Sequence, residues 1–360
     1  MRNGHGIMRR SYVIYQNPAM QEKLEVKAPI QSLANIEELR PEIGIPDYVD
    51  LSNFQMTKTV VALWASRHPD RIVEGAIEEP LKLALFGGGG FKLHCPSANK
   101  GPFSRTIGDV DLVTLKENGK LVVQILLNLS EKCGSMFYHG ITSADRRFNT
   151  LRFGMRYRIH TIQDIDEQSV PTAGLIDIFC DKLTFCHILD VRDELSQVDR
   201  HVFTIGLENL IISKAQLIKC VANDEASDIN QNRIMGEYDK NHLLVGMETK
   251  DMRDVGAALL DHDLGEGGEK ISIDVIGRKL RQDWGMWKTV TMNLKNMQNR
   301  LKPITDAFGA KKDEQEVIEE RLAKIVQELE GKYAARKKTF SFNKQWWQDV
   351  EDQETITPGS

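Results

Sequence analysis

The order of apolar and polar positions divides the chain into a part of mixed strands and helices and a part that is mostly helical. Apolar residues at helical spacing predict helices over residues 54–68 and 121–133. Between and after these helices, short apolar or alternating runs are typical of strands. The strands are expected at 81–86, within 105–115, at 153–162 and at 174–183. Strands and helices in this order predict an α/β domain built on a mixed sheet.

Beyond residue 205 a spacing of three and four residues dominates, which predicts an almost wholly helical domain. One apolar stripe covers residues 207–221 and contains Lys214. Two later stripes, 290–301 and 318–329, are separated by a segment with proline and glycine and predict an antiparallel helical hairpin. The expected organisation is an N-terminal arm (1–50), an α/β domain (51–205), a helical domain (206–340) and a C-terminal tail (341–360).

Composition narrows the class of protein. The 360 residues are 41% hydrophobic and 28% charged, as in a soluble globular protein. No apolar run reaches the length of about 18 residues that a membrane span needs, and the first residues lack the apolar core of a secretory signal. Five cysteines without a CxxC pair predict reduced thiols and a cytoplasmic location. A net charge of −5 argues against nonspecific coating of nucleic acid.

Two aspartates in the segment RTIGDVDLVTL suggest chemistry. Asp109 and Asp111 are separated by one residue, so both would point to the same face of a strand. Adjacent carboxylates repel each other unless a cation lies between them. Asp177, in a later apolar strand, would supply a third carboxylate. Three such groups can hold two magnesium ions for an in-line displacement at phosphorus, with manganese as the alternative metal.

A glycine run precedes the aspartates. In FGGGG, residues 86–90, a strand is expected to give way to a helix through four glycines. Backbone amides at such a turn can approach a phosphate without interference from side chains. The order of glycine turn, helix, Asp-x-Asp strand and later aspartate strand indicates a nucleotidyl-transfer site.

These motifs resemble a known family. GGGGFKLH (87–94) followed by RTIGDVDL (105–112) is similar to the glycine turn and aspartate pair of the polymerase-beta-like nucleotidyltransferase superfamily. ENLIISKAQLIKC (208–220) and TKDMRDVGAALL (249–260) resemble the helix lysine and the Lys-Asp-x-x-Asp element of the abortive-infection toxin nucleotidyltransferases, AbiEii. The resemblance extends over residues 81–260. This chain lacks the Ser or Thr that commonly follows the paired glycines in the family.

The resemblance implies a role for each matching residue. Asp109, Asp111 and Asp177 would bind metal and, with Lys214, form the catalytic set. The remaining matches would bind the nucleotide together with Lys214: Gly88, Gly89, Arg105, Lys250 and Asp254. It also implies a nucleoside triphosphate as donor, a tRNA or protein as acceptor, and an antitoxin partner.

Each feature also has a structural alternative. The aspartate pair alone fits an exposed strand end or the sugar-nucleotide site of a glycosyltransferase, and glycine runs form tight turns for backbone reasons. Asp177 can belong to a structural salt bridge, and Lys214 can extend from the edge of its stripe to water. Lys250 and Asp254 are four residues apart and can pair on a helix surface.

The sequence thus predicts a magnesium-dependent nucleotidyltransferase that modifies RNA or protein. The alternatives are a nucleotidyltransferase for small molecules of the aminoglycoside type and a catalytically inactive module that binds nucleotide or RNA. Arg156, Arg158 and His160 alternate on one expected strand, and this basic face would guide a polyanionic acceptor if the strand lies beside that of Asp177.

Overall fold

The computed structural model describes most of the chain from residue 39 onward. The described ranges are 39–51, 54–72, 80–132, 156–162, 173–198, 203–336 and 345–348. Most of the predicted N-terminal arm and most of the C-terminal tail therefore lie outside the described residues.

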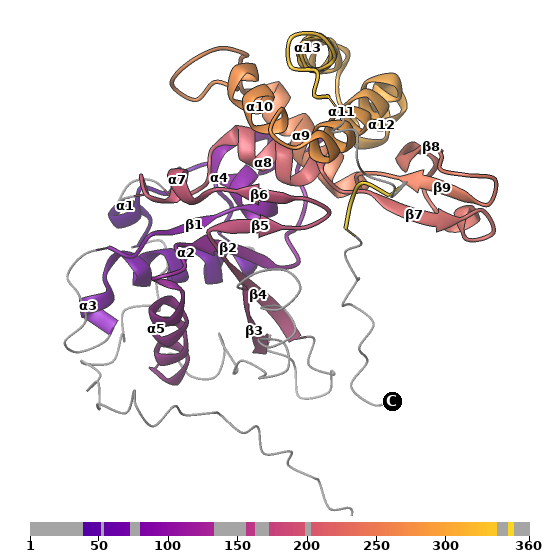
Figure 1. Cartoon of the computed structure of the whole chain (residues 1–360). Coiled ribbons are helices and arrows are strands. Elements are labelled where there is room, and N and C mark those ends of the chain that lie inside the picture. Colours follow the sequence, from indigo (N-terminus) through magenta and orange to yellow (C-terminus); the bar gives the residue numbers. More distant parts are fainter. Residues whose placement is uncertain are drawn as a thin grey trace, which may run out of the picture.

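A four-stranded mixed sheet forms the centre of the first part of the chain (Figure 1). Its order is β1 (Leu83–Leu85), β2 (Val110–Thr114), β4 (Ala173–Cys180) and β3 (Arg156–Ile162). The two central strands are parallel, and each edge strand is antiparallel to its neighbour. The predicted α/β arrangement with a mixed sheet is confirmed at this level.

Helices cover both faces of this sheet (Figure 1). On one face α2 (Phe54–Arg67) and α5 (Gly119–Lys132) pack against alternate strand residues such as Leu112 and Ile178. On the other face α4 (Gly87–His94) and α8 (Leu207–Ala215) pack with the intervening residues. Those residues include Val113 and Phe179, so the period of two along each strand also places Asp111 and Asp177 on the α4 face.

Five helices build most of the second part. They are α9 (Thr249–Asp261), α10 (Ile273–Leu280), α11 (Trp284–Asn299), α12 (Leu301–Phe308) and α13 (Lys312–Glu330). The start of α11 lies beside the end of α13, where the Trp287 indole donates to the Leu329 carbonyl at 2.9 Å. This is the expected hairpin, with α12 as an additional short helix in the connection. Gly309 ends α12 in the left-handed region, at φ 79°.

The expectation that the chain is almost wholly helical beyond residue 205 is wrong for residues 219–245. Here β7 (Lys219–Ala222), β9 (His242–Val245) and β8 (Ile234–Glu237) form an antiparallel sheet in that order. Helix α8 already ends at Ala215, so the last residues of the predicted stripe belong to a turn and to β7. Short apolar runs fit both periods, and pairing with β9 decides the conformation.

Smaller elements complete the described chain. They are the helices α1 (Leu39–Ile43), α3 (Pro69–Ile72) and α7 (Arg192–Leu195), the hairpin of β5 (Lys182–Thr184) and β6 (Ile188–Asp190), and three 3₁₀ turns at Pro96–Ala98, Glu225–Asp228 and Gln231–Arg233. In the tail, Trp347 is buried at 6% exposure and the Gln348 amide donates to the Cys186 carbonyl at 2.9 Å. This short segment therefore docks on the protein itself.

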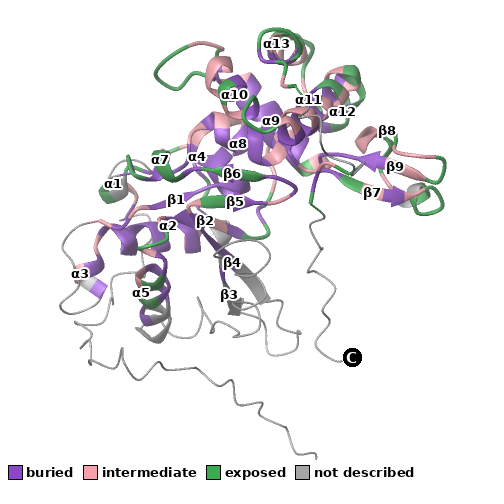
Figure 2. Ribbon diagram, viewed as in Figure 1, coloured by how far each residue is buried: buried purple, intermediate pink, exposed green. Residues whose placement is uncertain are grey.

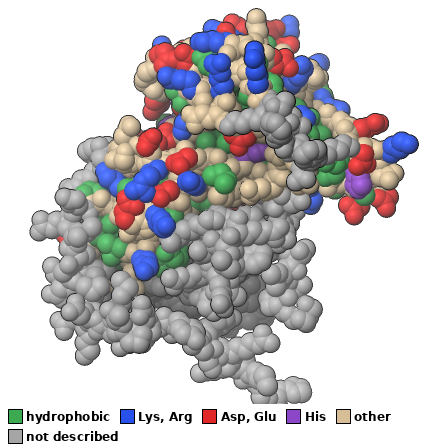
Figure 3. Space-filling model, in the orientation of Figure 1, with side chains coloured by type: hydrophobic (Ala, Val, Ile, Leu, Met, Phe, Trp, Pro, Cys, Tyr) green, Lys and Arg blue, Asp and Glu red, His purple; other side chains and the backbone are tan. Residues whose placement is uncertain are grey.

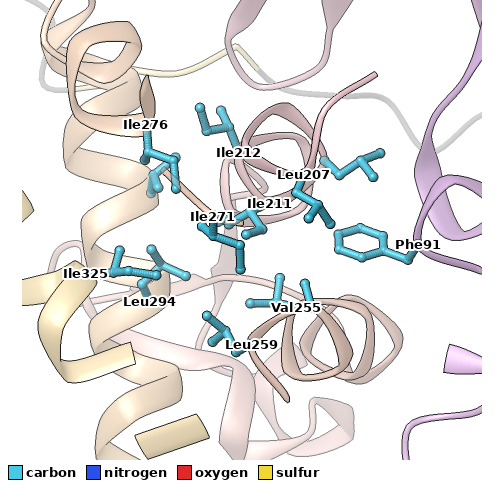
Figure 4. Packing of buried hydrophobic residues seen from close by; sticks show 14 of the residues in the cluster. Phe91, Leu207, Ile211, Ile212, Val255, Leu259, Ile271, Ile276, Leu294 and Ile325 are labelled. Carbon is cyan, nitrogen blue, oxygen red and sulfur yellow. The ribbon is translucent and has the colours of Figure 1, made fainter. Parts of the chain in front are cut away.

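Helices α4, α8 and α9 share one hydrophobic core. Figure 4 shows Phe91 of α4, Leu207 and Ile211 of α8, and Val255 and Leu259 of α9 pointing toward one another. Figure 2 shows the same region as a continuous buried zone between the sheet and the outer helices. Packing of this kind fixes the relative positions of the three helices, and all three carry predicted site residues.

Candidate functional site

The glycine turn joins β1 directly to α4. The helix begins at Gly87, so the glycines form its first turn and do not precede it. Gly87 has φ +62°, and a Cβ placed on it would lie 2.1 Å from Oδ2 of Asp111. A Cβ on Gly88 would lie 2.2 Å from Nη2 of Arg105. The two glycines therefore allow a carboxylate and a guanidinium to approach the backbone at the start of α4.

The first turn of α4 has no side-chain cap, because the N-cap residue is Phe86. Backbone amides at an uncapped helix start can bind an anion. Gly89 lies differently from Gly88: a Cβ on it would meet the Leu85 side chain at 3.1 Å. Gly89 thus serves the contact between α4 and β1, and only its backbone remains for the predicted nucleotide contact.

Two of the three predicted metal ligands lie on adjacent strands, and the third lies just before one of them. Asp111 of β2 is the direct register partner of Asp177 of β4. Partners on neighbouring parallel strands share a face and are about 4.8 Å apart along the hydrogen-bonding direction. Asp177 is buried at 5% exposure, whereas Asp109 is exposed and comes immediately before β2 instead of within it. The prediction that Asp109 and Asp111 lie on the same strand is therefore wrong for Asp109, because β2 begins at Val110.

The chemistry of these carboxylates suits magnesium, which takes one or two carboxylates together with substrate phosphates. Within the described ranges, however, no three carboxylate, histidine or cysteine side chains gather closely enough to hold a metal ion by themselves. A protein-only cage is thus not formed by Asp109, Asp111 and Asp177. A metal at this place would have to take further oxygen ligands from the substrate.

A buried network of four charges lies beside the glycine turn. Asp254 of α9 accepts two hydrogen bonds from Arg105, from Nε at 2.8 Å and from Nη2 at 2.7 Å. Lys214 of α8 donates to Oδ1 of Asp251 at 2.9 Å and lies 3.5 Å from Oδ2 of Asp254. Both aspartates are at most 2% exposed. Two cations and two carboxylates thus balance one another between the sheet, α8 and α9.

Burial and charge act in opposite directions on the cations of this network. Burial lowers the pKa of Lys214, but the carboxylates of Asp251 and Asp254 outweigh it, and the pKa is raised above its usual value. The pKa of Arg105 is likewise raised, because the hydrogen bonds and charge of Asp254 exceed the effect of burial. Both side chains therefore remain protonated across the physiological pH range.

The structural alternatives for Lys214 and for Lys250 with Asp254 are not found. Lys214 is 13% exposed and reaches a carboxylate instead of bulk water. Lys250 forms an ion pair with Glu248 at 3.0 Å, whereas Asp254 forms one with Arg105. Lys250 therefore does not form a surface pair with Asp254.

Residues from all four matched segments line one cavity of about 710 Å³. The predicted residues among them are Gly88, Arg105, Asp109, Asp111, Lys214 and Lys250. Sequence analysis missed four others: Thr106, Gly108, Thr249 and Arg253. Thr249 and Arg253 could have been found, since they are four residues apart and share a face of α9 with Lys250. Asp254 and Asp177 are buried and are not among the lining residues.

The face shown in Figure 3 carries basic and acidic side chains interspersed over the outer helices. Strand β3 neighbours β4, and the position of Arg158 is the register partner of Asp177. The side chains of Arg156, Arg158 and His160 lie outside the described part, so the predicted basic face stays a prediction. No described helix combines the length and apolar character needed to cross a membrane.

No family model and no curated protein matches this chain. The family resemblance therefore rests on the sequence motifs alone.

Proposed function

We propose that this protein is a nucleotidyltransferase of the AbiEii type that moves a nucleoside monophosphate from a triphosphate to a hydroxyl of RNA. The observation that carries the proposal is the cavity lined by residues from four segments between Gly88 and Arg253. These segments are the ones expected from the motifs, and they are far apart in sequence. If each motif had only a structural role, the four segments would not need to line the same cavity.

In the proposed reaction the triphosphate lies at the uncapped start of α4. The amides of Gly88 and its neighbours would donate to phosphate oxygens, as helix N-termini do for anions. Lys214, which has its charge fixed by Asp251, would offset further phosphate charge as a point cation. Arg105 would contribute through the N–H groups that neither Asp254 nor the Thr106 carbonyl uses.

The acceptor hydroxyl would attack the α-phosphorus from the side of the aspartates. A bond forms between the acceptor oxygen and phosphorus, the bond from phosphorus to the bridging oxygen breaks, and pyrophosphate leaves with the electron pair. Asp177 is the candidate to receive the hydroxyl proton, because it lies beside Asp111 and is shielded from water. Magnesium, or manganese, held by Asp109, Asp111 and Asp177, would stabilise negative charge on the attacking and leaving oxygens.

The test is transfer of label from each α-labelled nucleoside triphosphate to total RNA in the presence of magnesium. The expected result is labelled RNA with wild-type protein and no label with Asp111→Asn, since this change removes a metal-binding charge at nearly constant shape. Asp193→Asn is the matched control, because Asp193 is an exposed aspartate of α7 outside the cavity. Its transfer rate should equal that of the wild type.

Other outcomes would redirect the proposal. Label on a small aminoglycoside-type acceptor alone would favour the small-molecule enzyme, and label on protein would favour a protein acceptor. Nucleotide binding without any transfer would indicate an inactive binding module. Transfer that survives Asp111→Asn would contradict the assignment of the site. An antitoxin partner, which the resemblance also suggests, would appear as an inhibitor of this transfer.

A further inference from the structure

Arg253 has no counterpart in the motif assignment, yet it lines the cavity beside Thr249 and Lys250. Its position is fixed from two sides. Nη1 donates to the Ser104 carbonyl at 3.0 Å, and the guanidinium carbon lies 4.5 Å from the centre of the Phe308 ring. A guanidinium stacked on an aromatic ring and bound to a carbonyl loses little further freedom when it binds a ligand.

Arg253 differs from the other cations around the cavity in its ion pairing. Arg105 pairs with Asp254, Lys214 pairs with Asp251, and Lys250 pairs with Glu248. Within the described part of the chain, Arg253 forms no ion pair with a carboxylate. A guanidinium has five N–H donors, and the Ser104 carbonyl uses one of them.

An oriented cation with spare donors on a cavity wall is suited to a phosphate group. Two parallel N–H groups of an arginine match two phosphate oxygens, a geometry that a lysine ammonium cannot reproduce. The other three cations already have carboxylate partners. An incoming phosphate therefore meets the least competition from carboxylates at Arg253.

We propose that Arg253 binds a phosphate group of the ligand in this cavity through a bidentate contact. The inference rests on the proposed function, which supplies two sources of that phosphate. One is the triphosphate of the nucleotide, and the other is a phosphodiester of the RNA acceptor. In both cases Arg253 determines affinity for a phosphate, while Asp111 determines transfer.

The test measures two affinities separately: that of a fluorescent, non-hydrolysable triphosphate and that of labelled total tRNA, each with and without magnesium. Arg253→Gln is expected to weaken one of them by about 10- to 100-fold, the size of a lost charge-assisted contact. Arg253→Lys keeps the charge but loses the fork, so a weakening of at least about 5-fold is expected. Arg278→Gln is the control, since exposed Arg278 also donates to one backbone carbonyl and lies outside the cavity.

The two sources of phosphate give different patterns. If Arg253 binds the triphosphate, only the nucleotide affinity falls, and the KM for nucleotide rises with the KM for RNA unchanged. If it binds the acceptor, only the RNA affinity falls, and the slope of log affinity against log salt decreases by about 0.7–0.9. Either pattern supports the inference. Affinities for both ligands within two-fold of wild type, in variants with a wild-type melting temperature, would overturn it.

Thermal melting of each variant separates a lost contact from a lost fold, because the stacking on Phe308 also disappears in Arg253→Gln. If this variant unfolds, Arg253→Lys carries the test alone, and wild-type affinity for both ligands in that variant overturns the inference. Binding that depends on Arg253 without any transfer would leave the inference intact and remove the proposed function. Transfer by the wild type, together with unchanged affinity for both ligands in the Arg253 variants, would do the reverse. A wild-type protein that binds neither ligand would remove both.

Discussion

Replacing Asp254 with asparagine tests whether the buried charge network holds the site together. Asp254 has a side chain 3% exposed and accepts both hydrogen bonds of the Arg105 fork. Arg105 itself is 15% exposed and forms no other ion pair within the described residues. Lys214 would keep its closer partner Asp251 at 2.9 Å. The substitution therefore removes the direct ion-pair partner of the partly buried Arg105, and only the more distant carboxylates of Asp251 and Asp109 still act on it.

The expected cost follows from the loss of this ion-pair partner. Removing one member of a buried ion pair destabilises a protein by about 3–5 kcal/mol, because the remaining charge keeps its desolvation penalty. An asparagine still accepts one hydrogen bond, so the lower end of this range is expected. Replacing both partners with apolar residues, Arg105→Met with Asp254→Leu, should recover most of the loss, since no unpaired charge then remains.

Urea unfolding, monitored by circular dichroism, measures the free energy of unfolding of both variants and of the wild type. Asp306→Asn provides the control, because Asp306 pairs with Lys302 on an exposed helix surface and the pair is solvent-screened. Its midpoint should match that of the wild type. A loss below about 1 kcal/mol in Asp254→Asn would refute the reasoning, since such a value is typical of an exposed pair. A double variant less stable than the single one would refute the explanation through unpaired charge.

Two further predictions concern the glycine turn and pH. Gly87→Ala should abolish transfer, because its Cβ would displace Asp111, and it should lower the stability of the fold by more than Gly101→Ala does. In Gly101→Ala only the left-handed backbone conformation is unfavourable, at a cost of about 1–2 kcal/mol. Melting and transfer assays compare the two variants, and equal effects would contradict the close approach of Asp111 to Gly87. Burial lowers the pKa of His187 to about 4 in the folded protein. As the pH falls below about 6.5, the histidine of the unfolded chain is protonated while that of the folded protein stays neutral, which favours unfolding. About 2 kcal/mol of stability should therefore be lost by pH 5. His187→Gln, which can still bond to Thr289, should lose less between pH 7 and pH 5, and an unchanged pH dependence would show that another group is responsible.

Local patterns in the sequence were sufficient to predict the strands and helices around the site. A continuous apolar run predicted a strand around Asp177, and the order of elements predicted the mixed sheet in which Asp177 is the register partner of Asp111. Ion pairing was not predictable in the same way. Arg105 and its partner Asp254 are 149 residues apart, and their contact depends on the packing of α4, α8 and α9, which no local pattern encodes.

The three-stranded sheet at 219–245 was missed for a related reason. Strand β7 follows α8 after a turn of three residues, and its apolar residues continue the helical spacing of the stripe before it. What makes it a strand is the register with β9, where Val221 lies opposite Leu243. Pairing partners 22 residues away decided a conformation that the local sequence left ambiguous.

The site depends on both parts of the chain, although the predicted boundary at residue 205 lies between them. One hydrophobic core includes Phe91 of α4, Leu210 of α8 and Val255 of α9, and the charge network joins Arg105 to residues of the same two later helices. The glycine turn and the aspartates alone would present two carboxylates and a helix start with no cation fixed beside them. Because α8 and α9 carry these cations and also bury the face of α4, the packing that stabilises the fold also places positive charge beside the carboxylates of the cavity.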